Sequence, residues 1–412
     1  MLEFYFEKPI TIERLRAGPS GRFIDSFSGG LKKSGYSWWT ARVFLRAADH
    51  IGRYAEVHGQ DIGDIDWGTL TSFETHLPTC SCPDSSRCKT IDVVRGAKHF
   101  IDHLREKDIL KIPAVDDEEK MVAPLVLDFQ SWLRTHRGLS ESTVDHYSQA
   151  ASQFMTDQGE DASCYDAKTL REFVLDRAKT QGHGATKTLI SGLRMFMRFL
   201  ASQGLCRSNL DKAIPAVAFW RLTTIPRSLQ KHDVERILDA CDATSPMGLR
   251  DRAIILLFAR LGLRAGDIAG LLLDDLDWKD GSILVSGKSR RQARLPLSQE
   301  VGDAILEYLE HRPRSDAREV FLRSVAPFRA LMTGGSASQV VTRAMRRAGI
   351  TASCYGAHAL RHTAACEMIR QGVSLYEIGE VLRHKSVEMT AHYAKIDLGL
   401  LKQVALPWPE VK

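Results

Sequence analysis

The chain has 412 residues, of which 44% are hydrophobic and 26% are charged, and its formal net charge is +5. This length and balance predict roughly two to four globular domains, and they exclude a fibrous or an intrinsically disordered protein. The small excess of basic residues is compatible with a nucleic-acid partner but does not by itself demonstrate one.

Signals for export or membrane insertion are missing from the sequence. Residues 1–8 lack the basic start and apolar core of a secretory signal, and the apolar run at 253–258 is too short to span a bilayer. Eight cysteines are scattered along the chain, which is typical of reduced thiols rather than of a disulfide framework. We therefore expect a cytoplasmic protein with no membrane partner.

Residues 1 to about 220 have helical periodicity almost throughout, and one unit occurs in them twice. A Ser-x-x-Thr pattern begins at Ser37 and again at Ser140, each time before an apolar stretch, so each serine is expected to cap a helix. The segments 93–104 and 189–200 share a glycine, a basic residue, a phenylalanine and a leucine in the same order. Any two amphipathic helices share an apolar period, but the common order of elements favours a duplicated helical domain.

Two tryptophans, Trp38 and Trp39, open the helix that follows Ser37, and Arg42 lies one turn further on. One interpretation is that they face DNA. The other is that the pair divides between the core and the surface of the domain. We expect one of the two tryptophans to lie in the core.

A group of soft metal ligands lies later in the first copy. His76, Cys80, Cys82 and Cys88 fall within thirteen positions, and imidazole and thiolate are ligands that suit Zn²⁺. Their spacing, His-x3-Cys-x-Cys-x5-Cys, differs from that of the common zinc fingers. An ordinary loop with free thiols is therefore the alternative to a zinc site.

Breaks in the pattern predict three domains. A linker is expected at 111–120, which contains a proline and four consecutive acidic residues, and a second boundary near 215–226. The resulting domains are 1–112, an additional helical domain and potential DNA-binding duplicate; 121–215, a helical domain; and 227–412, where the pattern changes.

The last domain is predicted to be mainly helical around one small antiparallel sheet. Helical periodicity is expected at 234–240, 250–263, 299–311, 338–348, 358–371 and 374–382. Two short strands are expected at 281–287 and 293–297, and the polar residues 288–292 join them as a hairpin.

Five local motifs in this domain carry reactive side chains: Arg264 after a glycine turn, Lys288 with Arg290 and Arg291, His358-x-x-Arg361, His384, and Tyr393. Taken singly, each has an ordinary structural explanation as a solvated end, a surface charge or a half-buried ring. Together they fit one task. His358 and Arg361 are three residues apart and share a helix face, and a second guanidinium from Arg264 would help to stabilise a pentacoordinate phosphate.

Tyr393 supplies a nucleophile for such a phosphate. Its hydroxyl has an ordinary pKa near 10, so it requires neighbouring cations and a proton acceptor. A covalent phosphotyrosine retains the energy of the broken phosphodiester, so the strand can be rejoined without ATP, whereas a hydrolase has no use for it. Lys288 on the hairpin is suited to protonating the leaving 5′ oxygen. No carboxylate cluster of the kind that holds Mg²⁺ accompanies these residues, so we expect no metal cofactor.

Residues 227–396 resemble the catalytic domain of the tyrosine recombinase (phage integrase) family, on the series Arg, Lys, His-x-x-Arg, His, Tyr in that order. The resemblance implies these roles: phosphate clamps for Arg264 and Arg361, general acid for Lys288, acid/base near the nucleophile for His358, a hydrogen bond to the scissile phosphate for His384, and the 3′-phosphotyrosine link for Tyr393.

The resemblance also reaches residues around this series. Asp267 stands where the family has a supporting carboxylate, and Arg290 and Arg291 are expected along the DNA backbone. Arg383 replaces a common glycine and is expected to add positive charge near the DNA. Residues 121–210 resemble the family's helical (SAM-like) domain that clamps DNA, whereas the first copy lies outside the minimal pattern.

The resemblance implies a site-specific recombinase in which four protomers act on two double-stranded DNA sites through a Holliday junction, with other recombinases or host factors as additional partners. The function expected is integration, excision or transposition of a mobile element. Alternatives are resolution of replicon or chromosome dimers, a catalytically silent DNA-binding accessory protein, and a type IB topoisomerase. The apolar tail at 400–406 is expected to dock on a neighbouring protomer.

Overall fold

The structure is a computed structural model that describes residues 1–80, 82, 89–110, 123–216, 228–286, 292–352, 354–384, 386, 389–390, 393 and 395. The chain divides into two compact units, Met1–Ile112 with Thr224–Lys412 and Pro113–Thr223. The linker expected at 111–120, most of the boundary near 215–226, the hairpin tip and the tail lie outside the described residues. None of the described helices is both long and apolar enough to cross a membrane.

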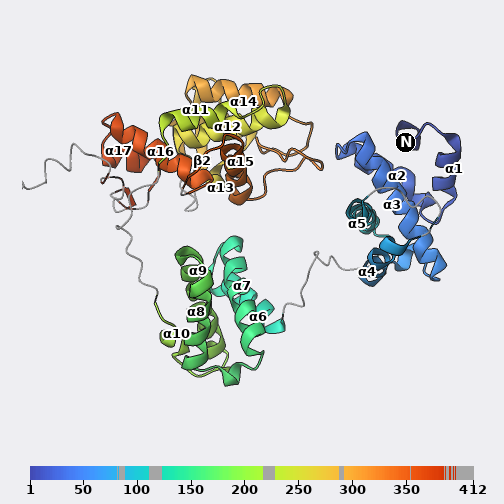
Figure 1. The fold of residues 1–412 in the computed structure, drawn as a ribbon, viewed down its shortest axis with the longest axis horizontal. Coiled ribbons are helices and arrows are strands. Elements are labelled where there is room, and N and C mark those ends of the chain that lie inside the picture. The colour runs from blue at the N-terminus through green and yellow to red at the C-terminus, as the bar shows by residue number, and fades with distance from the viewer. Residues whose placement is uncertain are drawn as a thin grey trace, which may run out of the picture. The chain divides into compact units, whose positions relative to one another are not determined.

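The first helical region, residues 1–110, is built on the pair of helices α3 and α5 (Figure 1). Its elements are η1 (Leu2–Phe4), α1 (Pro9–Ala17), α2 (Gly21–Lys33), α3 (Trp38–Val57), η2 (Ile62–Asp64), α4 (Trp67–His76), η3 (Leu77–Thr79) and α5 (Thr90–Glu106). Phe44, Phe73 and Phe100 are fully buried between these helices.

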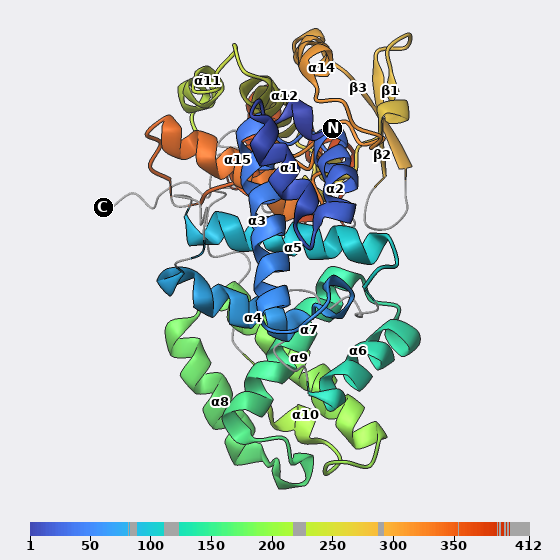
Figure 2. The same cartoon turned by 90° about the vertical axis from the view of Figure 1, so that its right-hand side faces the viewer.

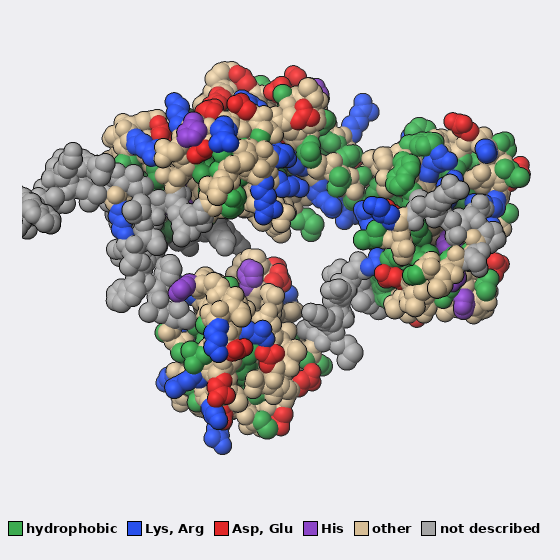
Figure 3. Space-filling view, viewed as in Figure 1, with side chains coloured by type: hydrophobic (Ala, Val, Ile, Leu, Met, Phe, Trp, Pro, Cys, Tyr) green, Lys and Arg blue, Asp and Glu red, His purple; other side chains and the backbone are tan. Residues whose placement is uncertain are grey.

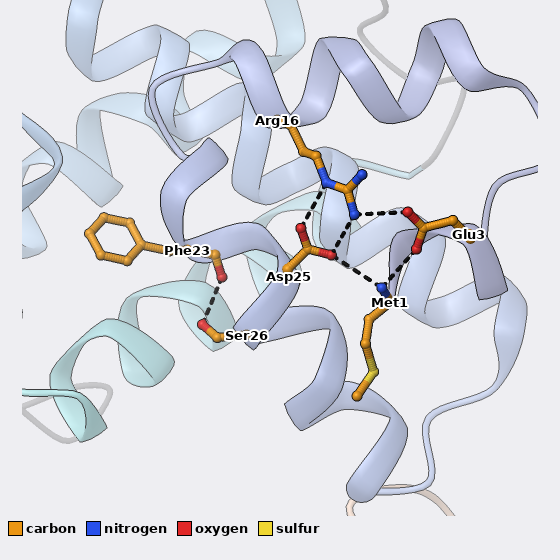
Figure 4. Close-up of polar contacts among 6 residues, drawn as sticks. All are labelled: Met1, Glu3, Arg16, Phe23, Asp25 and Ser26. Carbon is orange, nitrogen blue, oxygen red and sulfur yellow. Dashed lines mark hydrogen bonds and ion pairs between the residues drawn. The ribbon is translucent and has the colours of Figure 1, made fainter.

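Charged side chains join the start of this region to α2 (Figure 4). The Arg16 guanidinium donates to Asp25 through Nε at 2.8 Å and to Glu3 through Nη2 at 2.8 Å, and the Met1 nitrogen contacts both carboxylates. All four groups are well exposed, and exposed ion pairs contribute little because water screens them. The buried Leu2, rather than this network, therefore holds η1 in place.

The second helical region, residues 123–216, is the group of green helices α6 to α10 in Figure 2, and it has a hydrophobic core of its own. Its elements are α6 (Pro124–Arg137), α7 (Glu141–Gln158), η4 (Ala162–Cys164), α8 (Ala167–Thr180), α9 (His183–Ser202) and α10 (Leu210–Ala213). The longest pair, α7 and α9, packs as α3 and α5 do in the first region.

The two helical regions share their local capping chemistry. An aspartate one residue before the 3-10 helix accepts from the backbone in both, Asp61 before η2 and Asp161 before η4. The next helix begins with the same reciprocal Asp–Thr capping box, at Asp66 in α4 and at Asp166 in α8. Such boxes satisfy two otherwise unpaired backbone donors, so the same residues begin the same helices twice.

A glycine allows the long helices to approach closely in each region. A Cβ added at Gly96 would lie 2.7 Å from Cβ of Ala47, and one added at Gly192 would lie 2.9 Å from Cβ of Ala150. The neighbouring aromatic residue, Phe44 or Tyr147, would be met as well. The order α2, α3, η2, α4, α5 is therefore repeated as α6, α7, η4, α8, α9, with the same contact between the long helices.

The serine caps behave differently from each other. Ser37 accepts from the backbone of Thr40 at 3.2 Å, as expected. Ser140 occupies the N-cap position of α7, but its hydroxyl contacts the hydroxyl of Thr143 instead of a backbone N–H. The prediction of a side-chain cap is confirmed in the first region and wrong in the second.

The expectation that Trp38 or Trp39 lies in the core is wrong. Their exposed fractions are 44% and 58%. Both stand in the first turn of α3, ahead of the buried face that begins at Ala41. The guanidinium of Arg42 lies 4.1 Å from the ring centroid of Trp38 and covers it on the surface.

The C-terminal region, from residue 228, is mainly helical with one small sheet, which confirms the predicted fold class. Its elements are α11 (Lys231–Asp239), α12 (Pro246–Leu261), α13 (Ala265–Ala269), η5 (Leu273–Asp275), β1 (Leu276–Asp277), β2 (Ser282–Ser286), β3 (Gln292–Pro296), α14 (Gln299–His311), α15 (Gly334–Arg347), α16 (Ala357–Arg370) and α17 (Leu375–Val381). The strands run β1-β2-β3, all antiparallel.

Helix α12 is the centre of this region, since nearly all its residues from Gly248 to Ala259 are buried. The Ser245 side chain caps its first turn, and Gly262 ends it with a left-handed φ of +58°. A side chain at Gly262 would meet Leu382, with a Cβ 2.6 Å from Cδ2. The glycine turn therefore brings the segment after α12 against the end of α17, where the reactive side chains gather.

Candidate active site

Arg361 lies at the centre of the site, on α16. Its exposed fraction is 8%, and its guanidinium donates to the carbonyl of Gly262 and to that of Leu382. These carbonyls end α12 and follow α17, and they lie 99 and 21 residues from Arg361 in the sequence, so one planar guanidinium ties together three separate segments. This arrangement depends on the bare backbone at Gly262.

Arg264 and Asp267 follow on α13. The Asp267 carboxylate accepts from the backbone N–H of Arg264 at 3.1 Å, which caps the short helix. It also accepts from the guanidinium of Arg383, while the guanidinium of Arg264 donates to the carbonyl of Arg383. Asp267 thus lies on the arginine side of the site, among Arg264 and Arg383.

Arg383 does not extend toward solvent as a surface charge, because only 11% of its side chain is exposed. Its backbone has a left-handed φ of +52°, a conformation that glycine adopts most readily. Nε and Nη1 of its guanidinium are buried and have no hydrogen-bond partner among the described residues. The expected positive charge is therefore present, but inside the site.

Among the described residues, Asp267 forms an ion pair with Arg383, and its charge also acts on Arg264 and Arg361. Burial and, after it, the charge of Arg264 lower the pKa of Arg361 to about 10. Burial and the charge of Arg383 lower the pKa of Arg264. Since Asp267 compensates only one positive charge, the cluster retains an excess that would favour a bound anion.

Tyr393 presents its hydroxyl to a histidine that the sequence analysis did not select. The hydroxyl lies 2.7 Å from Nδ1 of His362, and the exposed fraction of Tyr393 is 3%. Burial raises the pKa of Tyr393 to about 12, although the charge of Arg361 acts in the opposite direction. The phenol is therefore protonated at neutral pH and requires a proton acceptor to become a nucleophile.

His358 and His362 lie one turn apart on α16, with ring centroids 4.5 Å apart. His358 is exposed, and partial desolvation and the charge of Arg361 lower its pKa. The contact to Tyr393 is made by His362, whereas the sequence placed His358 near the nucleophile. The i, i+4 spacing of the two histidines was the signal available for His362.

His384 lies beside the tyrosine ring, parallel to it within 2° and with centroids 6.2 Å apart. Its Nδ1 is 2.8 Å from the hydroxyl of the buried Thr390. Burial, followed by the charges of Arg361 and Arg264, lowers the pKa of His384 to about 4. The ring is therefore neutral at pH 7, and if Thr390 donates to Nδ1, then Nε2 carries the proton and can donate to an anion.

Lys288, Arg290 and Arg291 lie outside the described residues, so their positions relative to the cluster are not part of the structure. β2 and β3 pair from Ser282 with Pro296 to Ser286 with Gln292, so the two strands that flank this segment form the predicted ladder. Figure 3 shows Lys and Arg side chains gathered along the edge of the C-terminal region that is drawn lowest.

The described side chains can hold an anion and move a proton. Arg264, Arg361 and Arg383 supply positive charge, and His384 supplies a neutral donor. The hydroxyl of Tyr393 is a nucleophile in contact with a proton acceptor. This arrangement suits attack on a phosphodiester, in which negative charge accumulates on the phosphate oxygens in the transition state.

Comparison with known proteins agrees with this chemistry. Residues 227–398 match the family model described as the phage integrase family. The chain is 34% identical over 414 residues to the integrase/recombinase y4rA of Sinorhizobium fredii, and the match covers 99% of each chain. It is 28% identical over 280 residues to the tyrosine recombinase XerD of Lacticaseibacillus casei, which covers 66% of this chain and 94% of XerD.

A solved structure has the same fold. A lambda integrase tetramer bound to a Holliday junction matches with a TM-score of 0.51 at 17% identity, over 79% of this chain and 91% of the integrase chain.

Proposed function

The chain belongs to the phage integrase family of tyrosine recombinases, which cut and rejoin DNA strands, and on this premise we propose that it is the site-specific recombinase of a mobile element, acting through Tyr393. The observation that carries the proposal is the buried Tyr393 hydroxyl, 2.7 Å from Nδ1 of His362 and within reach of the charge of Arg361, on which Arg264 and Arg383 also act. A nucleophile and an anion site are the two requirements for strand transfer.

We assign the cleavage step to the following groups. His362 accepts the hydroxyl proton of Tyr393, and the phenolate oxygen bonds to the scissile phosphorus while the bond to the 5′ oxygen breaks. Lys288 donates a proton to that leaving oxygen. Arg264, Arg361 and His384 hold the phosphate oxygens. His358, on the exposed side of the site, acts as a second acid/base near the nucleophile. Rejoining is the same step in reverse, with a 5′ hydroxyl as the nucleophile.

Arg383 and Asp267 act on this step by positioning. Asp267 holds the start of α13 and the guanidinium of Arg383, so it fixes the backbone that carries Arg264. The two buried nitrogens of Arg383 that have no described partner lie among the phosphate-binding arginines. We propose that the phosphate of the bound DNA adds to their hydrogen bonding.

A nicked suicide substrate tests the chemistry. Attack next to the nick releases a short fragment that diffuses away, so the covalent complex accumulates and migrates slowly on a denaturing gel. Wild-type protein is expected to form this complex and Tyr393→Phe none, with DNA binding unchanged. Trapping that persists in Tyr393→Phe would refute the assignment, and no trapping by wild-type protein on its own site would favour an accessory protein.

The role in a mobile element is supported by the extent of the matches. The integrase/recombinase y4rA matches along 99% of this chain, including the first helical region, whereas nearly all of XerD matches only 66% of it. The additional region is thus a feature shared with a protein named as an integrase. Resolution of replicon or chromosome dimers is the second candidate, and a type IB topoisomerase the third.

An assay with two DNA sites separates these functions. A plasmid with two directly repeated element ends should lose the intervening segment, and an element end should join to a target site. Recombination confined to dimeric replicons would favour dimer resolution. Relaxation of a supercoiled plasmid without any recombinant product would favour a topoisomerase.

We propose that four protomers act on two duplex sites, because the lambda integrase of the same fold was solved as a tetramer on a Holliday junction. Residues 1–112 and 121–215 are proposed as two DNA-clamping domains, and 227–412 as the catalytic domain. The tail at 400–406, which lies outside the described residues, is proposed to dock on the next protomer. Removing the residues after 398 should then abolish paired-site complexes and spare binding to one site.

A further inference from the structure

Four soft ligand atoms, none of which has a role in the proposed function, meet in the first helical region. They belong to His50 in the middle of α3, His76 at the end of α4, and Cys80 and Cys82 in the segment that follows. All four atoms lie within 4.8 Å of one another. Nε2 of His50 is 3.4 Å from Sγ of Cys80, and Nε2 of His76 is 3.4 Å from Sγ of Cys82.

These distances suit a tetrahedral metal ion. Zn²⁺ binds imidazole nitrogen at about 2.0–2.1 Å and thiolate sulfur at about 2.3 Å, so neighbouring ligands of a tetrahedral site lie about 3.4–3.8 Å apart. The two His–Cys pairs already have such a spacing. All four residues are partly buried, and both thiols are free. The backbone N–H of Cys82 donates to Sγ of Cys80 at 3.4 Å, so the two cysteines are held close together.

The surrounding helices hold the imidazoles in this arrangement. The ring of His50 packs edge-on against Phe73, with centroids 4.9 Å apart, and the ring of His76 lies 5.1 Å from that of Tyr54. The 3-10 turn Leu77–Thr79 then reverses the chain at the end of α4 and returns Cys80 to α3. Metal ligands are therefore positioned by packing and by a turn, as a preformed site requires.

The second helical region shows that the fold does not need this cluster. When Ala47 is matched with Ala150 through the glycine contacts, His50 corresponds to Gln153, and when Phe73 is matched with Phe173, His76 corresponds to Asp176. The second region also replaces the cysteine segment, since α8 ends at Thr180 and α9 begins at His183. The four ligands thus occur together in one copy and are replaced in the other.

We propose that His50, His76, Cys80 and Cys82 form a structural Zn²⁺ site that fastens the connection between α4 and α5 to α3. Four protein ligands close the coordination sphere, which is typical of structural rather than catalytic zinc. The sequence suggested Cys88 as the fourth ligand, and Cys88 lies outside the described residues. The geometry selects His50, which is 26 positions upstream of His76 and belongs to no spacing motif.

Metal analysis of the full-length protein, expressed with added zinc and purified without chelator, tests the proposal. We expect about one zinc per chain in wild-type protein. His50→Gln places the residue of the second copy in α3 and should lose most of the zinc, as should Cys82→Ser. Cys88→Ser tests the sequence-based alternative and should retain zinc, and Cys164→Ser is the matched control in the second region.

Two further measurements separate metal loss from misfolding. Circular dichroism should show the same helix content in His50→Gln as in wild type. Co²⁺ in place of zinc should give the visible bands of a tetrahedral site and a thiolate charge-transfer band that is largely lost in Cys82→Ser. Wild-type zinc below about a tenth of an equivalent, full zinc in a folded His50→Gln, or a disulfide joining Cys80 and Cys82 would each overturn the proposal.

Discussion

The catalytic region and the first helical region each gather histidines from separate elements, but they surround them with opposite partners. In the catalytic region, burial and then the charges of Arg361 and Arg264 lower the pKa of His384 to about 4. In the first region, His50 and His76 each lie 3.4 Å from a cysteine sulfur. Histidines therefore contribute to an anion site in the catalytic region and to the proposed cation site in the first helical region.

The difference shows that a histidine cluster cannot be interpreted without its neighbours. Guanidiniums cannot bind a metal ion, and they repel one, whereas they stabilise a phosphate. Thiolates, in contrast, bind metal ions and repel a phosphate. Metal analysis tests the cation character of the first region, and four predictions test the anion character of the catalytic region, beginning with the largest expected effect.

Replacing Arg361 should have the largest effect. In Arg361→Ala the rate of covalent trapping is expected to fall by about 10²–10³, because one main donor to the phosphate is lost from a buried site. Arg361→Lys restores the charge without the fork and should recover only part of the rate. Arg370→Ala, on the exposed end of the same helix, is the control and should leave the rate unchanged. An unchanged rate in a folded Arg361→Ala would show that Arg361 does not bind the scissile phosphate.

Replacing His362 should slow cleavage by about 10²-fold, the usual contribution of one general base. His362→Ala should also flatten the pH–rate profile, which a purely structural defect would not do. A substrate with sulfur at the leaving 5′ position needs no general acid. It should rescue Lys288→Ala but not His362→Ala, and rescue of both variants would contradict the assignment of His362 as the proton acceptor.

Arg383→Gly restores the residue common in the family and should slow trapping by about tenfold or less, which corresponds to about 1.4 kcal/mol. The free energy of unfolding should change little, because two effects oppose each other. Glycine removes the strain of the left-handed backbone at φ +52°, but it leaves the buried Asp267 without its ion pair. Arg383→Lys keeps a charge and the strained backbone, so it should be less stable than Arg383→Gly. The opposite order of stability would show that the ion pair dominates.

The pH dependence of stability should show the environment of His384. Its pKa is lowered from 6.5 to about 4 in the folded protein, so the unfolded chain takes up a proton first as the pH falls. The contribution is complete above pH 6.5 and is lost as the pH falls toward 4. Between these values, wild-type protein should lose about 1–2 kcal/mol more than His384→Gln in denaturant titrations. Equal losses of unfolding free energy in the two proteins would mean that His384 is solvated like an ordinary surface histidine.

Much of the fold followed from local patterns. The strands β2 and β3 and the helix α14 lie close to the ranges expected, because each carries a period and its own turn residues. Among the elements that were not expected, α13 has five residues and β1 has two, which are too few to show a period. Tertiary contacts fix them: Asp267 caps α13, and β1 is held by its ladder to β2.

The two histidines that were missed illustrate the same limit within the sites. His362 stands next to Arg361, but it is not a member of the series Arg, Lys, His-x-x-Arg, His and Tyr. His50 is separated from Cys80 by thirty positions, which include η2, α4 and η3. Spacing detects ligands on one turn or one helix face, but it cannot detect a side chain that a second helix supplies.

The sequence by itself determined the family chemistry, because the order of Arg264, Lys288, His358, Arg361, His384 and Tyr393 is a pattern along the chain. The tertiary structure decided which groups touch: His362 with the Tyr393 hydroxyl, Arg383 with Asp267, and His50 with Cys80. The physical reason is that catalysis and metal binding depend on distances of a few ångströms between elements. Those distances are set by helix packing at positions such as Gly96 and Gly262, and helix packing is not a property of any one segment.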